Sequence, residues 1–110
     1  MFQMLSCFDL KPGISMAEFQ HALNQYCEHL MVRGLLESCG PIGQRQRDTI
    51  LDTDDERDQQ FFMLMFFRDK AQSDKAVEFI SDNLAIDNSL HRQLYSKADN
   101  FIFICWQDVQ

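Results

Sequence analysis

The chain has 110 residues, of which 45% are hydrophobic and 25% charged, and its formal net charge is −7 at pH 7. This length suits one compact domain without room for a second, so we expect residues 1–110 to form a single domain. The acidic balance argues against a nucleic-acid backbone or an anionic membrane as partner. No apolar stretch approaches the ~20 residues of a membrane helix. The N-terminal segment has no basic region or small-residue cleavage site, which predicts a cytoplasmic protein.

The first predicted strand covers residues 2–10 and ends at a Pro-Gly turn. A helix follows, and Ser15 with Glu18 three residues later forms a capping box at its start. Apolar residues then recur with helical spacing on one face: Phe19, Ala22, Leu23, Tyr26, Cys27 and Leu30. Gly34 is a suitable stop for this helix.

Residues 35–51 are predicted to form a bent second strand. Gly40, Pro41 and Gly43 interrupt it, and a proline in a strand belongs at an edge or a bulge. A charged segment, DTDDERD, follows. Its aspartates resemble the start of a calcium loop, but the glycine and the closing glutamate that such a loop needs are missing. We therefore expect a solvated hairpin loop and no metal site.

Residues 61–67, FFMLMFF, form the third predicted strand, and every side chain in it is large and apolar. A second helical region follows, with an interruption expected at residues 87–89 and a short helix after it. Residues 101–106, FIFICW, form the fourth strand, which is again apolar on both faces. The helical region carries one apolar stripe, continued by the short helix: Ala76, Phe79, Ile80, Leu84, Leu90, Leu94 and Tyr95.

The resulting order, β-α-β-β-α-β, is the split pattern of α+β ferredoxin-like domains. Right-handed crossovers place the first and third strands at the centre of a four-stranded antiparallel sheet, with both helices on one face. The helices account for only one of the two apolar faces of these strands. The bare face would exceed the roughly 300–600 Å² of apolar patch that monomers expose. We therefore expect a homodimer in which two sheets pack face to face about a two-fold axis.

With this element order, the strand–turn–helix segment DLKPGISMAEF and the aromatic strands, the whole chain resembles the dimeric α+β barrel superfamily. Its members include antibiotic-biosynthesis-type monooxygenases, muconolactone-isomerase-like enzymes, ethyl-tert-butyl-ether-degradation-type proteins and stress-responsive barrel proteins, besides many uncharacterised bacterial proteins. The resemblance implies a dimer that encloses a pocket between sheet and helices or inside the barrel. No catalytic motif of these families is recognisable in the chain, so no catalytic residue is transferred from them.

The four cysteines are irregularly spaced, without a C-x-x-C motif or a local histidine partner. Free thiols in a reducing compartment are therefore expected in preference to disulfides or zinc. Cys7, Cys27 and Cys105 lie within apolar patterns, where cysteine behaves as a small hydrophobic residue.

His29 and Arg68 are the candidates for catalysis. His29 lies on the flank of the predicted first helix, and the alternative for it is a boundary histidine bonded to a carbonyl or to water. His91, near Tyr95, has the same two interpretations. Arg68 ends the third strand, where it would hold an anionic or carbonyl group at the end of an apolar cavity. The alternative for Arg68 is an ion pair with one of three acids: Asp48, Asp69 or Glu37.

Tyr26, Arg45, Arg47 and Trp106 are the candidate ligand-binding residues. The aromatic pair suits an apolar pocket, but such residues also form cores and interfaces. The arginines share one side of the predicted second strand, where a solvated edge or interfacial ion pairs are the alternative. No phosphate-binding loop, serine-nucleophile motif or metal cluster occurs, so no cofactor is expected.

Two functions remain open. The first is a dimeric barrel that binds a small apolar or aromatic metabolite, with cofactor-independent monooxygenase- or isomerase-like activity as its enzymatic form. The second is a non-catalytic regulatory or stress-related dimer whose barrel is filled with side chains. A cavity between sheet and helices would favour the first.

Overall fold

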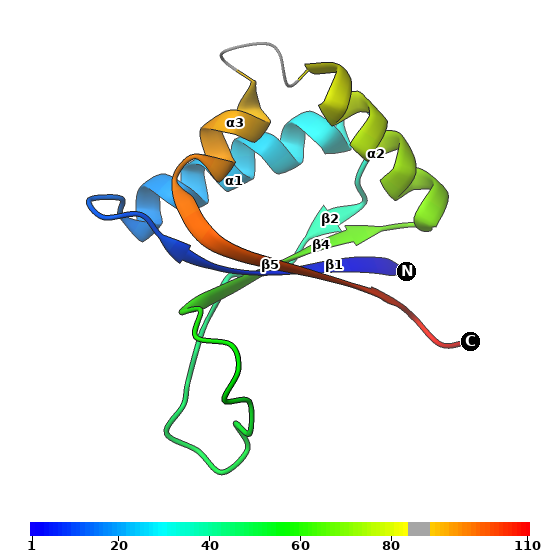
Figure 1. The fold of residues 1–110 in the computed structure, drawn as a ribbon. Helices are drawn as coiled ribbons and strands as arrows, with labels where there is room; N and C mark the ends of the chain where they lie inside the picture. Colours follow the sequence, from blue (N-terminus) through cyan, green and yellow to red (C-terminus); the bar gives the residue numbers. More distant parts are fainter. Residues whose placement is uncertain (84–88) are drawn as a thin grey trace.

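A computed structural model describes residues 1–83 and 89–110 and shows, for these residues, one sheet with three helices on one of its faces (Figure 1). The elements are β1 (Phe2–Leu10), α1 (Met16–Met31), β2 (Ser38–Cys39), β3 (Gly43–Gln44), β4 (Phe61–Phe67), α2 (Lys70–Asn83), α3 (Leu90–Tyr95) and β5 (Ala98–Gln107). The strand order is β2-β4-β1-β5, with β3 also paired to β4, and these pairings are antiparallel. This confirms the predicted ferredoxin-like α+β arrangement.

Helix α1 begins and ends where the sequence predicts. The Ser15 side chain accepts a hydrogen bond from the Glu18 amide at 3.1 Å. At the other end Gly34 has a φ of +70°, a conformation that suits glycine and stops the helix. All six residues of the predicted apolar stripe are buried: Phe19, Ala22, Leu23, Tyr26, Cys27 and Leu30.

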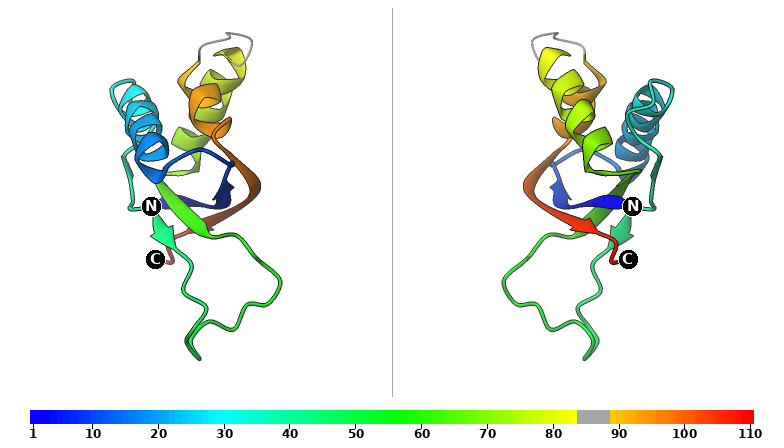
Figure 2. Two further views of the ribbon diagram at one scale, coloured as in Figure 1. Left: turned by 90° about the vertical axis from the view of Figure 1, so that its left-hand side faces the viewer. Right: turned by 90° about the vertical axis from the view of Figure 1, so that its right-hand side faces the viewer.

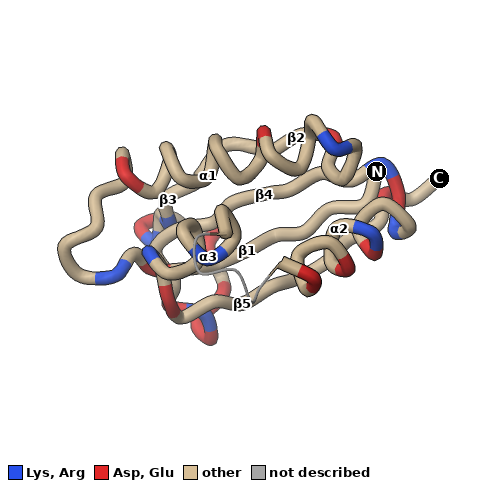
Figure 3. Tube along the Cα trace, turned by 90° about the horizontal axis from the view of Figure 1, so that it is seen from above, with Lys and Arg blue, Asp and Glu red and all other residues tan. Residues whose placement is uncertain are grey.

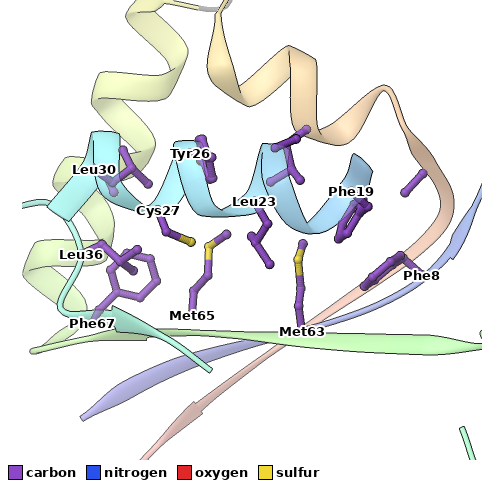
Figure 4. Close-up of a cluster of buried hydrophobic side chains, with 14 residues drawn as sticks. Phe8, Phe19, Leu23, Tyr26, Cys27, Leu30, Leu36, Met63, Met65 and Phe67 are labelled. Carbon is purple, nitrogen blue, oxygen red and sulfur yellow. The ribbon is translucent and has the colours of Figure 1, made fainter. Parts of the chain in front are cut away.

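The core lies between α1 and the strands below it (Figure 4). Phe8 of β1 stacks on Phe19 of α1 with ring centroids 4.7 Å apart. Met63 and Met65 of β4 are buried beside them, whereas Leu64 between these two is only half-buried. Each fully buried apolar side chain of this size contributes roughly 1.5–3 kcal/mol. The residues of each strand that face the helices therefore make the core.

The predicted strand over residues 35–51 is wrong in its second half. Only Ser38–Cys39 and Gly43–Gln44 pair with β4. The last hydrogen bond at this end joins the Arg45 amide to the Gln60 carbonyl at 2.7 Å. Pro41 has no amide hydrogen to donate to a ladder, which favours a break between the two short strands. Residues 45–60, which we call the arm, then leave the sheet on the side opposite the helices (Figures 1 and 2).

Helices α2 and α3 keep most of the predicted stripe. Ala76 is buried, and Phe79, Ile80, Leu90 and Tyr95 are partly buried against the core. Leu84 and residues 87–88 of the predicted interruption lie outside the described residues. Ser89 caps α3, since its side chain accepts from the Arg92 amide at 3.1 Å.

Gln72 is a buried polar residue that the apolar pattern does not reveal. Its Oε1 accepts from the Arg68 amide at 2.7 Å, and its Nε2 donates to the Gly34 carbonyl and to Glu37 Oε1, both at 3.0 Å. These bonds satisfy a buried amide. They also join the start of α2 to the chain that follows α1.

The expectation of four free thiols is wrong for two of them. Cys27 and Cys39 form a disulfide, with their Cα atoms 6.6 Å apart. Cys27 belongs to the buried stripe of α1, and α1 contacts the edge strand β2 that carries Cys39, so the packing brings the two sulfurs together. Cys7 and Cys105 are free. Among the described residues no helix is long and apolar enough to cross a membrane.

Candidate ligand-binding cleft

A cleft of about 910 Å³ lies between the sheet and the helices. Figure 2 shows all three helices above the same face of the sheet, with α1 toward one edge and α2 with α3 toward the other. Ligand pockets usually measure about 300–1,000 Å³, so the cleft is large enough for a metabolite. Phe103 on its floor is 50% exposed, which shows that the cleft opens along β5. Most of the floor comes from helix-facing strand residues: Phe2, Met4, Met65, Phe67, Phe103 and Cys105.

An aromatic cluster centred on Tyr95 forms part of the cleft wall. The Tyr95 ring centroid lies 4.5 Å from that of His91, 5.3 Å from Phe101, 6.2 Å from Phe103 and 6.1 Å from Tyr26. His91 and Tyr95 are four residues apart on α3 and therefore share one face of that helix. Offset and edge-on aromatic contacts of this kind suit the binding of a further flat ring.

Three polar groups lie within this aromatic cluster. Burial raises the pKa of the Tyr26 hydroxyl, with a smaller contribution from Tyr95, and burial also raises the pKa of the Tyr95 hydroxyl. Desolvation lowers the pKa of His91. At neutral pH the cleft therefore presents two protonated hydroxyls and a neutral imidazole. Within the part of the chain that the structure describes, no hydrogen bond involves these three groups.

The two catalytic candidates lie outside this cluster. His29 lines a smaller adjoining hollow of about 200 Å³, to which Tyr26 and His91 also belong. Its Nδ1 is 3.1 Å from Arg33 Nη1, and desolvation together with that guanidinium lowers the pKa of His29. Arg68 is exposed and pairs with Glu37 at 3.4 Å and Asp69 at 3.5 Å, and it does not line the cleft.

The four ligand-binding candidates are divided between the two faces of the sheet. Tyr26 lines the cleft, whereas Trp106 and Arg45 line a separate hollow of about 560 Å³ on the opposite face. Arg45 binds the Asp52 carboxylate there, with Nη2 2.7 Å from Oδ1. Arg47 is exposed and donates to the Arg57 carbonyl at 2.8 Å. Among the hollows formed by the described residues, none of those above contains all four.

The sequence offers His91 with the same two interpretations as His29, but it does not identify Tyr95 and Phe103 as cleft residues. The only local signal for Tyr95 is its four-residue spacing from His91, which indicates a shared helix face. That α3 lies above β5 follows from the tertiary packing, because Tyr95 contacts Phe101 and Phe103 across the fold. A single sequence carries no direct signal for this contact.

No family model and no curated protein matches the chain. Among solved structures, a protein of Arabidopsis thaliana (At3g17210) matches with a TM-score of 0.68 and 10% identity over 100% of this chain and 97% of that one. A dimeric ferredoxin-like protein of unknown function from Jannaschia sp. matches at 0.58 and 17% identity, over 97% and 98%. A Dabb family protein with a ferredoxin-like fold from Mesorhizobium loti matches at 0.50 and 16% identity, over 99% and 97%. The chain thus has the fold of the dimeric α+β barrel proteins that its sequence resembles.

Proposed function

We propose that the chain is a homodimeric binding protein for a small apolar or aromatic molecule, held in the cleft between sheet and helices. The observation that carries this proposal is the aromatic cleft of about 910 Å³. The alternative, a regulatory dimer with a filled interior, would leave no such space. The few polar groups among many aromatic ones are typical of a site that orients a largely apolar ligand.

The open face of the sheet supports the homodimer. Figure 3 shows that charged residues are sparse along β1, β4 and β5. Trp106 is 57% exposed on this face. The face that lacks helices is made of alternate residues of the three strands: Gln3, Leu5, Cys7, Phe62, Leu64, Phe66, Ile102, Ile104 and Trp106. A second copy related by a two-fold axis would cover it.

The size of the surface supports the same conclusion. The chain has 7094 Å² of accessible surface, against about 6,300 Å² expected for a compact monomer of its 13.0 kDa mass. Its radius of gyration is 14.6 Å, where a compact chain of this length has about 13 Å. The chain therefore exposes more surface than a compact monomer of its mass, part of it on the arm that leaves the sheet. Neighbours from Jannaschia sp., Thermobifida fusca and Bacteroides fragilis are dimeric proteins of unknown function.

Proton transfer is a second candidate function, favoured by His91. Its neutral imidazole is suited to accept a proton from an acidic C–H or O–H group of a bound ligand and to return it at another atom. The Tyr26 or Tyr95 hydroxyl would donate a hydrogen bond to a ligand carbonyl during this step. A proton acceptor beside two hydroxyl donors is what such an isomerisation needs, so of the two enzymatic forms expected from the sequence we propose the isomerase-like one.

Ligand binding is tested by thermal denaturation in the presence of flat phenols and aromatic acids. A ligand at 100 times its Kd stabilises the folded state by about 2.7 kcal/mol, which raises the melting temperature measurably. Cys105→Trp should abolish this rise, because the exposed Cys105 lies on the cleft floor and a large side chain there fills the space. Val109→Trp, at a 98% exposed position, is the matched control. Equal stabilisation of the Cys105→Trp variant would refute the cleft as the site.

The dimer is tested by sedimentation velocity. The parent chain should sediment as a species of twice 13.0 kDa, and Leu64→Asp on the open face should give the monomer with unchanged circular dichroism. Val77→Asp, an apolar-to-acidic change at an exposed position of α2, should leave the dimer intact. A parent chain that stays monomeric at micromolar concentration would contradict the proposal.

A further inference from the structure

The arm, residues 45–60, is a folded segment held by one arginine. The Arg45 guanidinium contacts both oxygens of the Asp52 carboxylate and donates to the Asp54 and Arg57 carbonyls, each at 2.9 Å. Arg47 donates to the same Arg57 carbonyl at 2.8 Å. A guanidinium that uses its whole fork in this way fixes the chain around it, because each hydrogen bond restricts another part of the loop.

The base of the arm is tied to the sheet. The Gln60 amide donates to Asp9 Oδ1 at 2.8 Å, and Asn100 Nδ2 donates to Asp58 Oδ1 at 3.1 Å and to Asp9 Oδ2 at 2.9 Å. Gln59, which is buried, donates from Nε2 to the Asn100 carbonyl at 2.8 Å. The arm is thus held in one direction relative to β1, β4 and β5.

The tip of the arm is apolar. Ile50 is 94% exposed and Leu51 86% exposed, and they follow one another at the turn. Turn tips in water usually carry Gly, Asn, Asp or Ser. Ordering a loop costs conformational entropy, and these two side chains regain none of it by burial within their own chain. An ordered arm with an apolar tip is therefore typical of a segment that packs against another body.

We propose that the arm clasps a second copy of this chain and packs Ile50 and Leu51 against it. The proposal rests on the homodimer proposed above. The partner is a second copy because the arm and the open sheet face form one continuous surface. Arg45 and Arg57 of the arm and Phe62 and Trp106 of the sheet line the same hollow of about 560 Å³. A body that covers the open face must therefore also meet the root of the arm.

The reach of the arm fits this role. An extended chain spans at most about 3.3–3.6 Å per residue, so the six residues from Arg45 to Leu51 reach up to about 20 Å. Packed sheets lie about 10 Å apart. Because the arm points away from its own helices (Figure 1), its tip extends beyond the sheet layer of the second copy and contacts that copy at its edge. The two-fold axis makes the clasp mutual, with each arm holding the other chain.

Photo-crosslinking tests the contact directly. A benzophenone amino acid placed at Ile50 or Leu51 should give a covalent dimer on a denaturing gel after irradiation. The same residue at Trp106 reports on the sheet-to-sheet contact. Leu64→Asp, added to the Ile50 variant, is the control that should remove the band. Peptide mapping of the crosslinked product then identifies the surface that receives the tip.

Substitution supplies a second measurement that does not depend on crosslinking chemistry. Ile50→Asp with Leu51→Asp should raise the dimer dissociation constant at least tenfold in sedimentation experiments. Thr49→Asp with Thr53→Asp adds the same charge to exposed positions of the arm and should change the constant much less.

The outcomes separate the two proposals. A dimer that crosslinks from Trp106 but not from the tip, with equal dissociation constants for the two double variants, overturns the clasp and leaves the homodimer in place. A chain that crosslinks from no position and sediments as a monomer overturns both. Crosslinks from the tip that survive Leu64→Asp would show that the arm packs on a body other than this dimer, and would also overturn the clasp.

Discussion

The two faces of the sheet are built from the same three strands and carry similar side chains, but their surroundings differ. On the helix face Phe8, Met63 and Met65 are buried. On the open face Leu5, Phe62 and Leu64 are only half-buried. Since apolar content does not distinguish the faces, the difference lies in what each face packs against. The helices complete one face within the chain, and the other face needs a second body.

Truncation of one side chain on each face should give the sharpest difference. Phe8→Ala removes a ring that is fully buried between Phe19, Phe61 and Phe101, and should cost about 3–5 kcal/mol of unfolding free energy. This loss should not depend on protein concentration. Leu64→Ala should change the unfolding free energy of the isolated chain little. The urea midpoint of this variant should fall on dilution, because the weakened dimer dissociates.

Urea denaturation at several protein concentrations measures both effects. The comparison fails if Leu64→Ala destabilises as much as Phe8→Ala at every concentration. That result would mean that the open face is already packed within one chain.

The disulfide strengthens the helix face at its edge. Cys27 lies on α1, Cys39 lies on β2, and the crosslink closes a loop with a sequence separation of 12 residues. A loop of about this length stabilises by roughly 3 kcal/mol through the unfolded state. Cys39→Ala should lower the unfolding free energy by about that much, and reductant should not lower the stability of this variant further. In the parent chain, reductant should lower the urea midpoint, and alkylation without reductant should label two thiols. Labelling of all four would contradict the disulfide.

How much the sequence predicts depends on whether a feature lies within one element or joins distant parts of the chain. The six-residue stripe of α1 and the continuous apolar run of β4 are local patterns, so they predict the elements and the fold. The Cys27–Cys39 bond, the Gln72 hydrogen bonds and the cluster around Tyr95 join residues that are distant in sequence, and no spacing rule reveals them. The predicted second strand is wrong after Gln44, because Arg45 binds Asp52 and holds that segment in a loop. The sequence shows that the segment is charged, but it does not show which residues pair.

Gly43 tests the edge of the open face. A Cβ at this position would lie 1.8 Å from the Phe62 ring, which covers the edge strand at that point. Gly43→Ala should therefore force the ring outward and cost about 1–3 kcal/mol, as overpacking does. Phe62→Leu in the same chain should recover much of this loss, since it removes the clashing ring atoms. Additive effects of the two substitutions in urea denaturation would show that Phe62 does not cover Gly43.

The smallest expected effect comes from His91 in the cleft. Desolvation holds the pKa of His91 below its ordinary value of 6.5, so between the two values the unfolded chain binds more protons than the folded one. Its contribution to stability is fully present above pH 6.5 and declines as the pH falls through the folded pKa. His91→Gln should therefore flatten the fall in melting temperature between about pH 7 and pH 5, although His29 retains a contribution of the same sign. A ligand bound beside the neutral imidazole should also stabilise the parent chain less at pH 5. An NMR titration that gives His91 a pKa of 6.5 or higher would remove the basis for its proposed role as a proton acceptor.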